Sequence, residues 1–249
     1  MILYALAAGT FTWLLTTLGA SAVLLTKEVN RKILDASLGF AAGVMVAASF
    51  FSLLLPSIEI SDSWFPAVIG FLLGGLFLKL LDSTIPHLHI GFNIEESEGA
   101  KIPLKKTTLL FLAVTIHNIP EGLSIGVSFG ESIGAALTLA LGIGIQNIPE
   151  GMAISLPLRG EGFSRVKSFT YGSLSGLVEP AFSVFGFLAI TIFSQILPYA
   201  LAFAAGAMIY VVVEELIPES QLHGNEDVAT LSAMLGFAVM MFLDLYFSF

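Results

Sequence analysis

Residues 40–45 read FAAGVM and residues 203–208 read FAAGAM, at an offset of 163 residues. Each copy lies in an apolar stretch that reaches a proline near its end, Pro56 in the first and Pro218 in the second. The apolar stretches that follow them agree at an offset of 162, in the pairs Gly74 with Gly236 and Asp82 with Asp244. Because the two offsets differ by a single residue, we expect the fold to contain two related sets of helices.

The composition places these stretches in a lipid bilayer. Of the 249 residues, 56% are hydrophobic and only 12% are charged, which is more apolar surface than a water-soluble domain can bury. A helix needs about 20 mainly apolar residues to cross a bilayer. The sequence has eight such runs, at residues 2–25, 35–55, 64–81, 107–129, 132–157, 168–193, 197–217 and 228–248. We therefore predict an all-α polytopic membrane protein with a single transmembrane domain over residues 1–249.

The lysines and arginines predict how the chain is oriented. All ten occupy or flank odd-numbered loops between the predicted spans: Lys27, Arg31, Lys32, Lys79, Lys101, Lys105, Lys106, Arg159, Arg165 and Lys167. Cytoplasmic loops accumulate such residues, so we expect a plasma (inner) membrane protein with both termini outside. The net charge of −9 is inconsistent with binding to nucleic acid.

In this orientation the repeated stretches cross the membrane in opposite directions. The second and seventh spans are antiparallel, as are the third and eighth. Two helix triplets related in this way around a central pair are the inverted-repeat plan of secondary transporters. We expect a 3+2+3 arrangement with a first triplet at 1–81, a cytoplasmic loop at 82–106, a central pair at 107–157 and a second triplet at 168–249.

The central pair carries two copies of one motif, HNIPEG at 117–122 and QNIPEG at 146–151. The proline has no N–H, so the carbonyl four residues earlier loses its helical donor and needs another partner, such as a cation, a packed serine or water. The first and fifth motif residues share one helical face. An ionised glutamate near the bilayer centre costs about 2.5 kcal/mol or more. Neither stretch carries a Lys or Arg partner, and a divalent metal would supply the missing charge.

A third carboxylate lies in the sixth span, where Glu179 precedes a proline and again has no basic neighbour. Imidazole, amide and carboxylate groups together suit Zn²⁺, and also Fe²⁺, Mn²⁺ or Cd²⁺. Three crowded carboxylates cannot all stay ionised without a counter-ion, so we expect the site to release protons when metal binds. In a straight antiparallel hairpin Glu121 and Glu150 would differ in depth by roughly 15 Å. Either the helices break at the prolines or two neighbouring sites exist.

Other functions fit less well. An intramembrane metallohydrolase would carry a HExxH helix with a glutamate base, but the second motif position here is Asn118. We therefore expect no enzymatic activity. A metal sensor would need an output domain, which these runs do not leave room for. A divalent cation channel remains an alternative, because sequence does not separate a channel from a carrier.

With both motifs in place, the chain resembles the ZIP family of divalent metal transporters, of the bacterial type. The resemblance covers essentially the whole chain, including the loop with PHLHIG and the run EELIPES. It implies import of zinc, and also of cadmium, iron or manganese, through a site between the fourth, fifth and sixth spans. It assigns metal-binding roles to His117, Asn118, Glu121, Gln146, Asn147, Glu150 and Glu179. In members with two metals, Glu121 and Glu150 would bridge the ions, and Asn118, Asn147 and Glu179 would complete the second position.

A path to the cytoplasm can also be predicted. We expect it to involve His87 and His89 in the third loop, with Glu214, Glu215, Glu219 and His223 at the cytoplasmic end of the seventh span. Glu215 corresponds to Ser52 in the repeat, since each lies nine residues after the matched glycine. The pairs Gly70/Gly74 and Gly172/Gly176 have the spacing of close helix contacts. These contacts lie either within the protomer or between two copies, which leaves a homodimer open.

Overall fold

The structure, a computed structural model, describes residues 1–25, 30–88, 95, 97–102 and 106–247. In this part of the chain the regular elements are helices, and the single β-bridge joins His87 to Glu98. The expected all-α fold is confirmed. The order is α1 (Ile2–Ala20), α2 (Ala22–Leu25), α3 (Arg31–Ala47), η1 (Ala48–Leu54), α4 (Leu55–Ser61), α5 (Trp64–Thr84), α6 (Lys106–Ser128), α7 (Ile133–Gly160), α8 (Arg165–Ser175), α9 (Val178–Ile192), η3 (Ser194–Ile196), α10 (Leu197–Val211), η4 (Val212–Leu216), α11 (Ile217–Gln221) and α12 (Glu226–Phe247).

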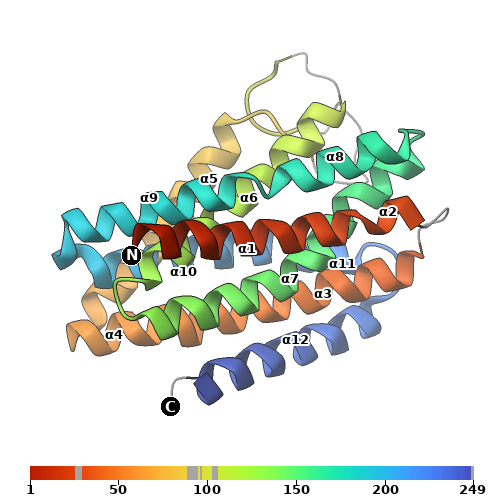
Figure 1. Ribbon diagram of the computed structural model, residues 1–249. Helices are drawn as coiled ribbons and strands as arrows, with labels where there is room; N and C mark the ends of the chain where they lie inside the picture. The colour runs from red at the N-terminus through yellow and green to blue at the C-terminus, as the bar shows by residue number, and fades with distance from the viewer. Residues whose placement is uncertain (26–29, 89–94, 96, 103–105, 248–249) are drawn as a thin grey trace.

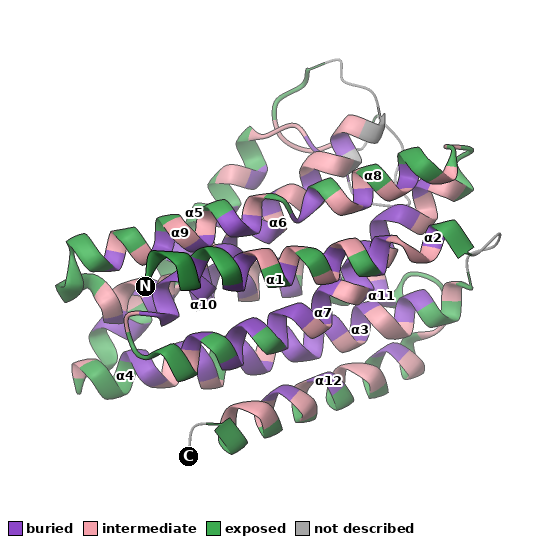
Figure 2. Cartoon of the chain, in the orientation of Figure 1, coloured by how far each residue is buried: buried purple, intermediate pink, exposed green. Residues whose placement is uncertain are grey.

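Six helical segments in the described residues are long and apolar enough to cross a membrane: Ile2–Leu25, Arg31–Ser61, Trp64–Thr84, Arg165–Ile192, Ser194–Gln221 and Glu226–Phe247. They correspond to six of the eight expected spans. α6 and α7 have 23 and 28 residues, which is long enough, but they are not among the six. α7 is largely buried (Figure 2), so it need not present an apolar surface to lipid.

The helices fall into two packed groups (Figure 1). In one group α3 lies along α12 and α5 lies along α10, and in the other α1 packs on α7 and α9, with α6 also on α9. Contacts of α3 with α7 and of α10 with α6 join the groups. The two motif helices therefore lie at the junction between the groups.

The repeat detected in the sequence is present in the packing of the first group. Gly43 of α3 packs against the backbone of Ala233 in α12, and Gly206 of α10 packs against the backbone of Phe71 in α5. The two contacts correspond in the repeat, because Gly43 and Gly206 are 163 residues apart and Phe71 and Ala233 are 162 residues apart. Gly74 against Phe203 and Gly236 against Phe40 form a second matched pair of contacts. A π-helical segment follows each of the repeated helices, η1 after α3 and η4 after α10. Each segment ends two residues before the matched proline, Pro56 in the first and Pro218 in the second.

The glycine pairs noted in the sequence mediate contacts inside the protomer. Gly70 and Gly74 lie against α10, and Gly172 lies against Gly151 of α7. A side chain at Gly74 would collide with the carbonyl of Phe203. The spacing therefore brings helices of one chain together, and a homodimer stays a prediction.

The motif helices do not break at their prolines. α6 and α7 continue through Pro120 and Pro149. The sixth apolar run, expected as one helix, is divided into α8 and α9 by a turn at Gly176 and Leu177. Glu179 thus lies in the first turn of α9, where a helix favours negative charge. The proline that follows it is tolerated there because the first-turn N–H groups have no helical acceptor.

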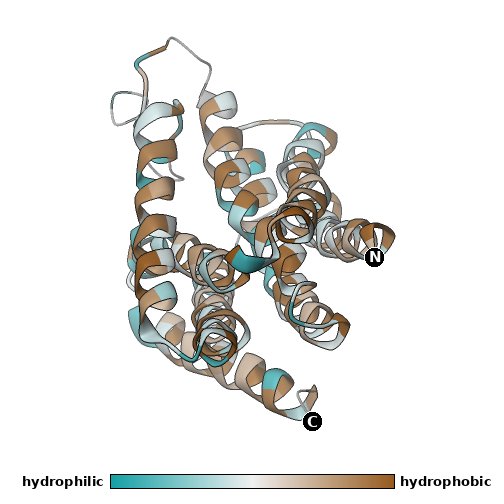
Figure 3. Cartoon of the chain, turned by 90° about the vertical axis from the view of Figure 1, so that its left-hand side faces the viewer, coloured by the Kyte–Doolittle hydropathy of each residue, from teal (hydrophilic) through white to brown (hydrophobic). Residues whose placement is uncertain are grey.

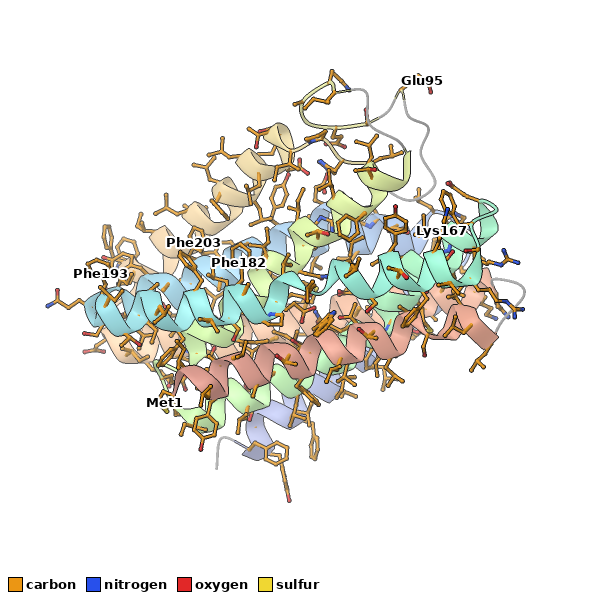
Figure 4. The ribbon with its side chains drawn as sticks, turned by 45° about the horizontal axis from the view of Figure 1, so that its top comes forward. Met1, Glu95, Lys167, Phe182, Phe193 and Phe203 are labelled. Atoms are coloured by element: carbon orange, nitrogen blue, oxygen red, sulfur yellow. The ribbon has the colours of Figure 1, made fainter. Side chains whose placement is uncertain are left out.

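The surface and the ends of the chain fit a membrane setting. Figure 3, viewed from the end that holds both termini, shows hydrophobic residues along all the helices. Large apolar side chains such as Leu72, Phe185 and Leu231 are exposed. Met1 lies at one end of the bundle and Lys167 at the other (Figure 4).

Two adjacent glycines in α5 test the close α5–α10 contact. We expect Gly74→Ala to destabilise the protein by about 1–3 kcal/mol, because its methyl group would force the two backbones apart. Gly75→Ala is the matched control, since its methyl group would meet only the Gly206 carbonyl at an ordinary distance of 3.8 Å. Thermal unfolding in detergent measures both. Equal melting temperatures for the two variants would contradict the packing described here.

Candidate metal-binding site

The predicted metal-binding residues lie together where α6, α7 and α9 meet. Six of the seven are buried and His117 is half-buried: His117, Asn118 and Glu121 on α6, Gln146, Asn147 and Glu150 on α7, and Glu179 on α9. Each motif places its first, second and fifth residues on the inner side of its helix. The turn before α9 brings the third glutamate to the same depth.

Gln146 links the two motif glutamates. Its Nε2 donates to Glu121 Oε1 at 2.6 Å and lies 3.5 Å from Glu150 Oε1. Glu121 and Glu150 are therefore joined through one amide although neither helix breaks at its proline. Of the two possibilities that the sequence left open, the helix break is absent.

Asn147 forms a second link, between α7 and α9. Its Nδ2 donates to Glu179 Oε2 at 2.9 Å, and Glu179 Oε1 accepts from the hydroxyl of Thr16 in α1 at 3.2 Å. The negative charge of Glu179 also acts on both motif glutamates. The three carboxylates thus form one electrostatic unit, held in two hydrogen-bonded groups.

Several oxygens in this unit have no hydrogen-bond donor among the described residues. They include the side-chain carbonyls of Asn118, Gln146 and Asn147, each on a residue that is at most 1% exposed. Burying an amide oxygen without a partner costs roughly 1–3 kcal/mol. Amide and carboxylate oxygens are also ligands that divalent cations accept. Within the described residues none of the three glutamates forms an ion pair with Lys or Arg.

His117 turns toward the seventh apolar run. Its Nε2 lies 2.5 Å from Glu215 Oε1, a contact that spans the junction of the two helix groups. A cavity of about 30 Å³ adjoins this pair and is lined in part by Glu150 and Glu219. The site and the predicted cytoplasmic path are therefore adjacent.

Glu215 also belongs to a second cluster. Its carboxylate lies with Asp82 and His87 such that one ligand atom from each falls within 4.8 Å of the others, and Asp82, Glu98 and Glu214 form a similar group. His87 Nε2 lies 2.9 Å from Asp82 Oδ1. In the described part of the chain, these two groups are the sets of three His, Asp or Glu side chains that lie close enough together to hold a metal ion.

The remaining path residues are distributed differently. His223 lies beside the buried Asp35 of α3, with 3.6 Å between Nδ1 and Oδ1, and it is in neither of the two groups. His89 lies outside the described residues. Asp82 was noted only as a repeat match, although it belongs to both groups. Its position at the end of a predicted span, five residues before His87, could have indicated that it belongs to the predicted path.

A larger cavity of about 410 Å³ opens at the opposite end of the bundle. It is lined by Ser52, Glu59, Glu131 and Asp244 among others, and Ser52 donates to Asp244 at 2.6 Å. Desolvation, with the charges of Asp244 and Glu59, raises the pKa of Glu131 to about 7. This carboxylate is therefore protonated as the pH falls below about 7, and the cavity then loses part of its negative charge.

Comparison with known proteins identifies the family. Residues 95–244 match the family model described as ZIP zinc transporter. The chain is 39% identical to the zinc transporter ZIP11 of Homo sapiens, over 94% of each chain. It is 41% identical to the zinc transporter GufA of Myxococcus xanthus over 92% of this chain and 93% of the relative, and 39% identical to the zinc transporter ZIPB of Bordetella bronchiseptica over 97% and 80%. The chain belongs to the ZIP family of zinc transporters.

Proposed function

We propose that this protein imports zinc across a membrane toward the cytoplasm. The observation that carries the proposal is the group of three buried glutamates without a Lys or Arg counter-ion in the described structure. Relatives named as zinc transporters, and not as enzymes, support it. Cadmium, iron and manganese are further candidate substrates, because Gln146 supplies an oxygen ligand and not an imidazole.

We further propose that all eight long helical segments cross the membrane in the 3+2+3 inverted-repeat arrangement, with α6 and α7 as the central pair. The matched glycine contacts of α3 with α12 and of α10 with α5 support this arrangement. Lys167 lies at the opposite end of the bundle from Met1 (Figure 4). Because cytoplasmic ends are rich in Lys and Arg, we place both termini outside, in the plasma membrane.

The metal would bind in two neighbouring positions. His117 and Gln146 serve the first position, Asn118, Asn147 and Glu179 serve the second, and Glu121 and Glu150 lie between them. The link from Gln146 to both motif glutamates supports this division. So does the separate link from Asn147 to Glu179.

Release would proceed through Glu215, which contacts His117 on one side and belongs to the Asp82–His87 cluster on the other. Glu214 and Glu219 lie beside this route. We propose that the helix groups move relative to each other to open it, as in alternating access. A channel is the alternative, and flux that saturates with zinc concentration would exclude a simple open pore.

Zinc uptake into proteoliposomes tests the site. We expect Glu121→Ala and Glu150→Ala to reduce the rate at least about 10-fold, because each removes a charged ligand and even ligand-supporting residues contribute 10–100-fold to metal affinity. The exposed Glu226, in the first turn of α12, supplies the matched control Glu226→Ala. Uptake that is unchanged in both motif variants would end the site assignment.

Proton release on zinc binding provides a second test. Ligands must be deprotonated before they bind metal, so zinc added at pH 7 should release at least one proton per protein molecule, and zinc affinity should fall as the pH falls. A pH-sensitive dye in weak buffer measures the release. Glu121→Gln should release fewer protons than the native chain. Zinc binding without proton release would rule out a protonated carboxylate cluster.

A further inference from the structure

The first helix supplies polar groups to the site although no sequence motif marks it. Thr12 and Thr16 of α1 are one helical turn apart and at most 1% exposed. The Thr16 hydroxyl donates to Glu179 Oε1 at 3.2 Å, whereas the Thr12 hydroxyl donates to the backbone carbonyl of Gly9 at 3.0 Å. In the described structure this carboxylate therefore has one hydroxyl donor, from Thr16, and one amide donor, from Asn147, in place of a cationic partner.

The geometry at Thr16 favours this interaction over the local alternative. Its hydroxyl lies 3.2 Å from Glu179 Oε1 and 3.3 Å from the carbonyl of Thr12. A hydroxyl has one proton to donate, and a hydrogen bond to a charged acceptor is the stronger one. The proton is thus directed to the carboxylate.

The same helix orients Asn147. One N–H of its amide donates to Glu179 Oε2 at 2.9 Å, and the Nδ2 atom also lies 3.3 Å from the backbone carbonyl of Thr12. With its nitrogen engaged by α1 and α9, the amide has only Oδ1 available for a ligand. Oδ1 is buried and has no hydrogen-bond partner in the described residues.

Glycines allow α1 to come this close. A side chain at Gly9 of α1 would lie 2.8 Å from Cα of Pro180, and one at Gly176 would lie 2.6 Å from Glu179 Oε1 and 2.8 Å from Thr16 Oγ1. Cβ atoms do not tolerate contacts this short. The residues around Thr16 and Glu179 therefore leave room for the hydroxyl–carboxylate contact and for little else.

We propose that Thr16 is a positioning residue for zinc binding. Its hydroxyl holds Glu179, and the backbone carbonyl of Thr12 holds Asn147, so that the remaining oxygens of both ligands face the metal. The inference rests on the proposed function and extends the site to α1. Residues that orient metal ligands in this way typically contribute 10–100-fold to metal affinity. Thr16 is the better test residue, because the Thr12 contact to Asn147 uses the backbone and survives a side-chain change.

Zinc titration calorimetry on the purified full chain, together with proteoliposome uptake, tests the proposal. We expect Thr16→Val, which removes the hydroxyl and keeps the shape, to weaken zinc binding 10–100-fold and to raise KM more than it lowers kcat. Thr16→Ser should restore native binding. Thr17→Val is the matched control, since it removes a hydroxyl of the same helix that contacts Ser173 in α8 at 2.8 Å.

A double variant separates positioning from a structural role. In a Glu179→Ala background, Thr16→Val should have no further effect on zinc affinity, because the group that it positions is absent. Native affinity in Thr16→Val, or an equal loss in both backgrounds, would overturn the proposal. If Glu179→Ala and Glu121→Ala themselves bind zinc normally, the proposed metal site fails. If the glutamate variants lose zinc binding but Thr16→Val binds zinc with native affinity, the inference about α1 is wrong and the proposed metal site still stands.

Discussion

The structure depends on keeping three carboxylates inside a mainly apolar helix bundle without Lys or Arg beside them in the described residues. Charge in such a place is costly, so each carboxylate needs polar contacts from its neighbours. Glu121 and Glu150 are joined through Gln146, and Glu179 is held by Asn147 and Thr16. These contacts are neutral donors, which leave the net negative charge uncompensated. A divalent cation would supply the opposite charge, which is the basis of the proposed metal site.

The sequence predicted the elements whose signal is local or repeated. Apolar runs located the helices, and the FAAGVM/FAAGAM repeat anticipated that α3 and α10 make matching contacts with α12 and α5. The spacing of the motif residues predicted a shared helical face, and the structure links Gln146 with Glu121 and Glu150, and Asn147 with Glu179. Their role in binding metal stays a prediction. α6 and α7, which carry the motif residues, are not among the six candidate spans in the described residues.

Other features depend on contacts between distant residues and were not predictable. The helix break, one of the two possibilities that the sequence left open, is absent from the motif helices. The sixth run is interrupted instead, because the turn at Gly176 and Leu177 is followed by a new helix that starts at Val178 and holds Glu179 in its first turn. Thr16 was not singled out, since threonines are common in apolar helices and only the approach of α9 to α1 brings Glu179 to its hydroxyl. His223 lies beside Asp35, on a helix that the sequence did not associate with it.

The two ends of the repeat show how one packing scheme can carry different chemistry. Ser52 contacts Asp244 at one end, and the corresponding Glu215 lies with Asp82 at the other. A crystal of the zinc-loaded protein, with anomalous scattering recorded at the zinc absorption edge, tests the central claim most directly. The account predicts a zinc peak within coordination distance of both Glu121 and Glu150. Zinc bound only at the Asp82–His87–Glu215 cluster, with no peak beside the motif glutamates, would contradict it.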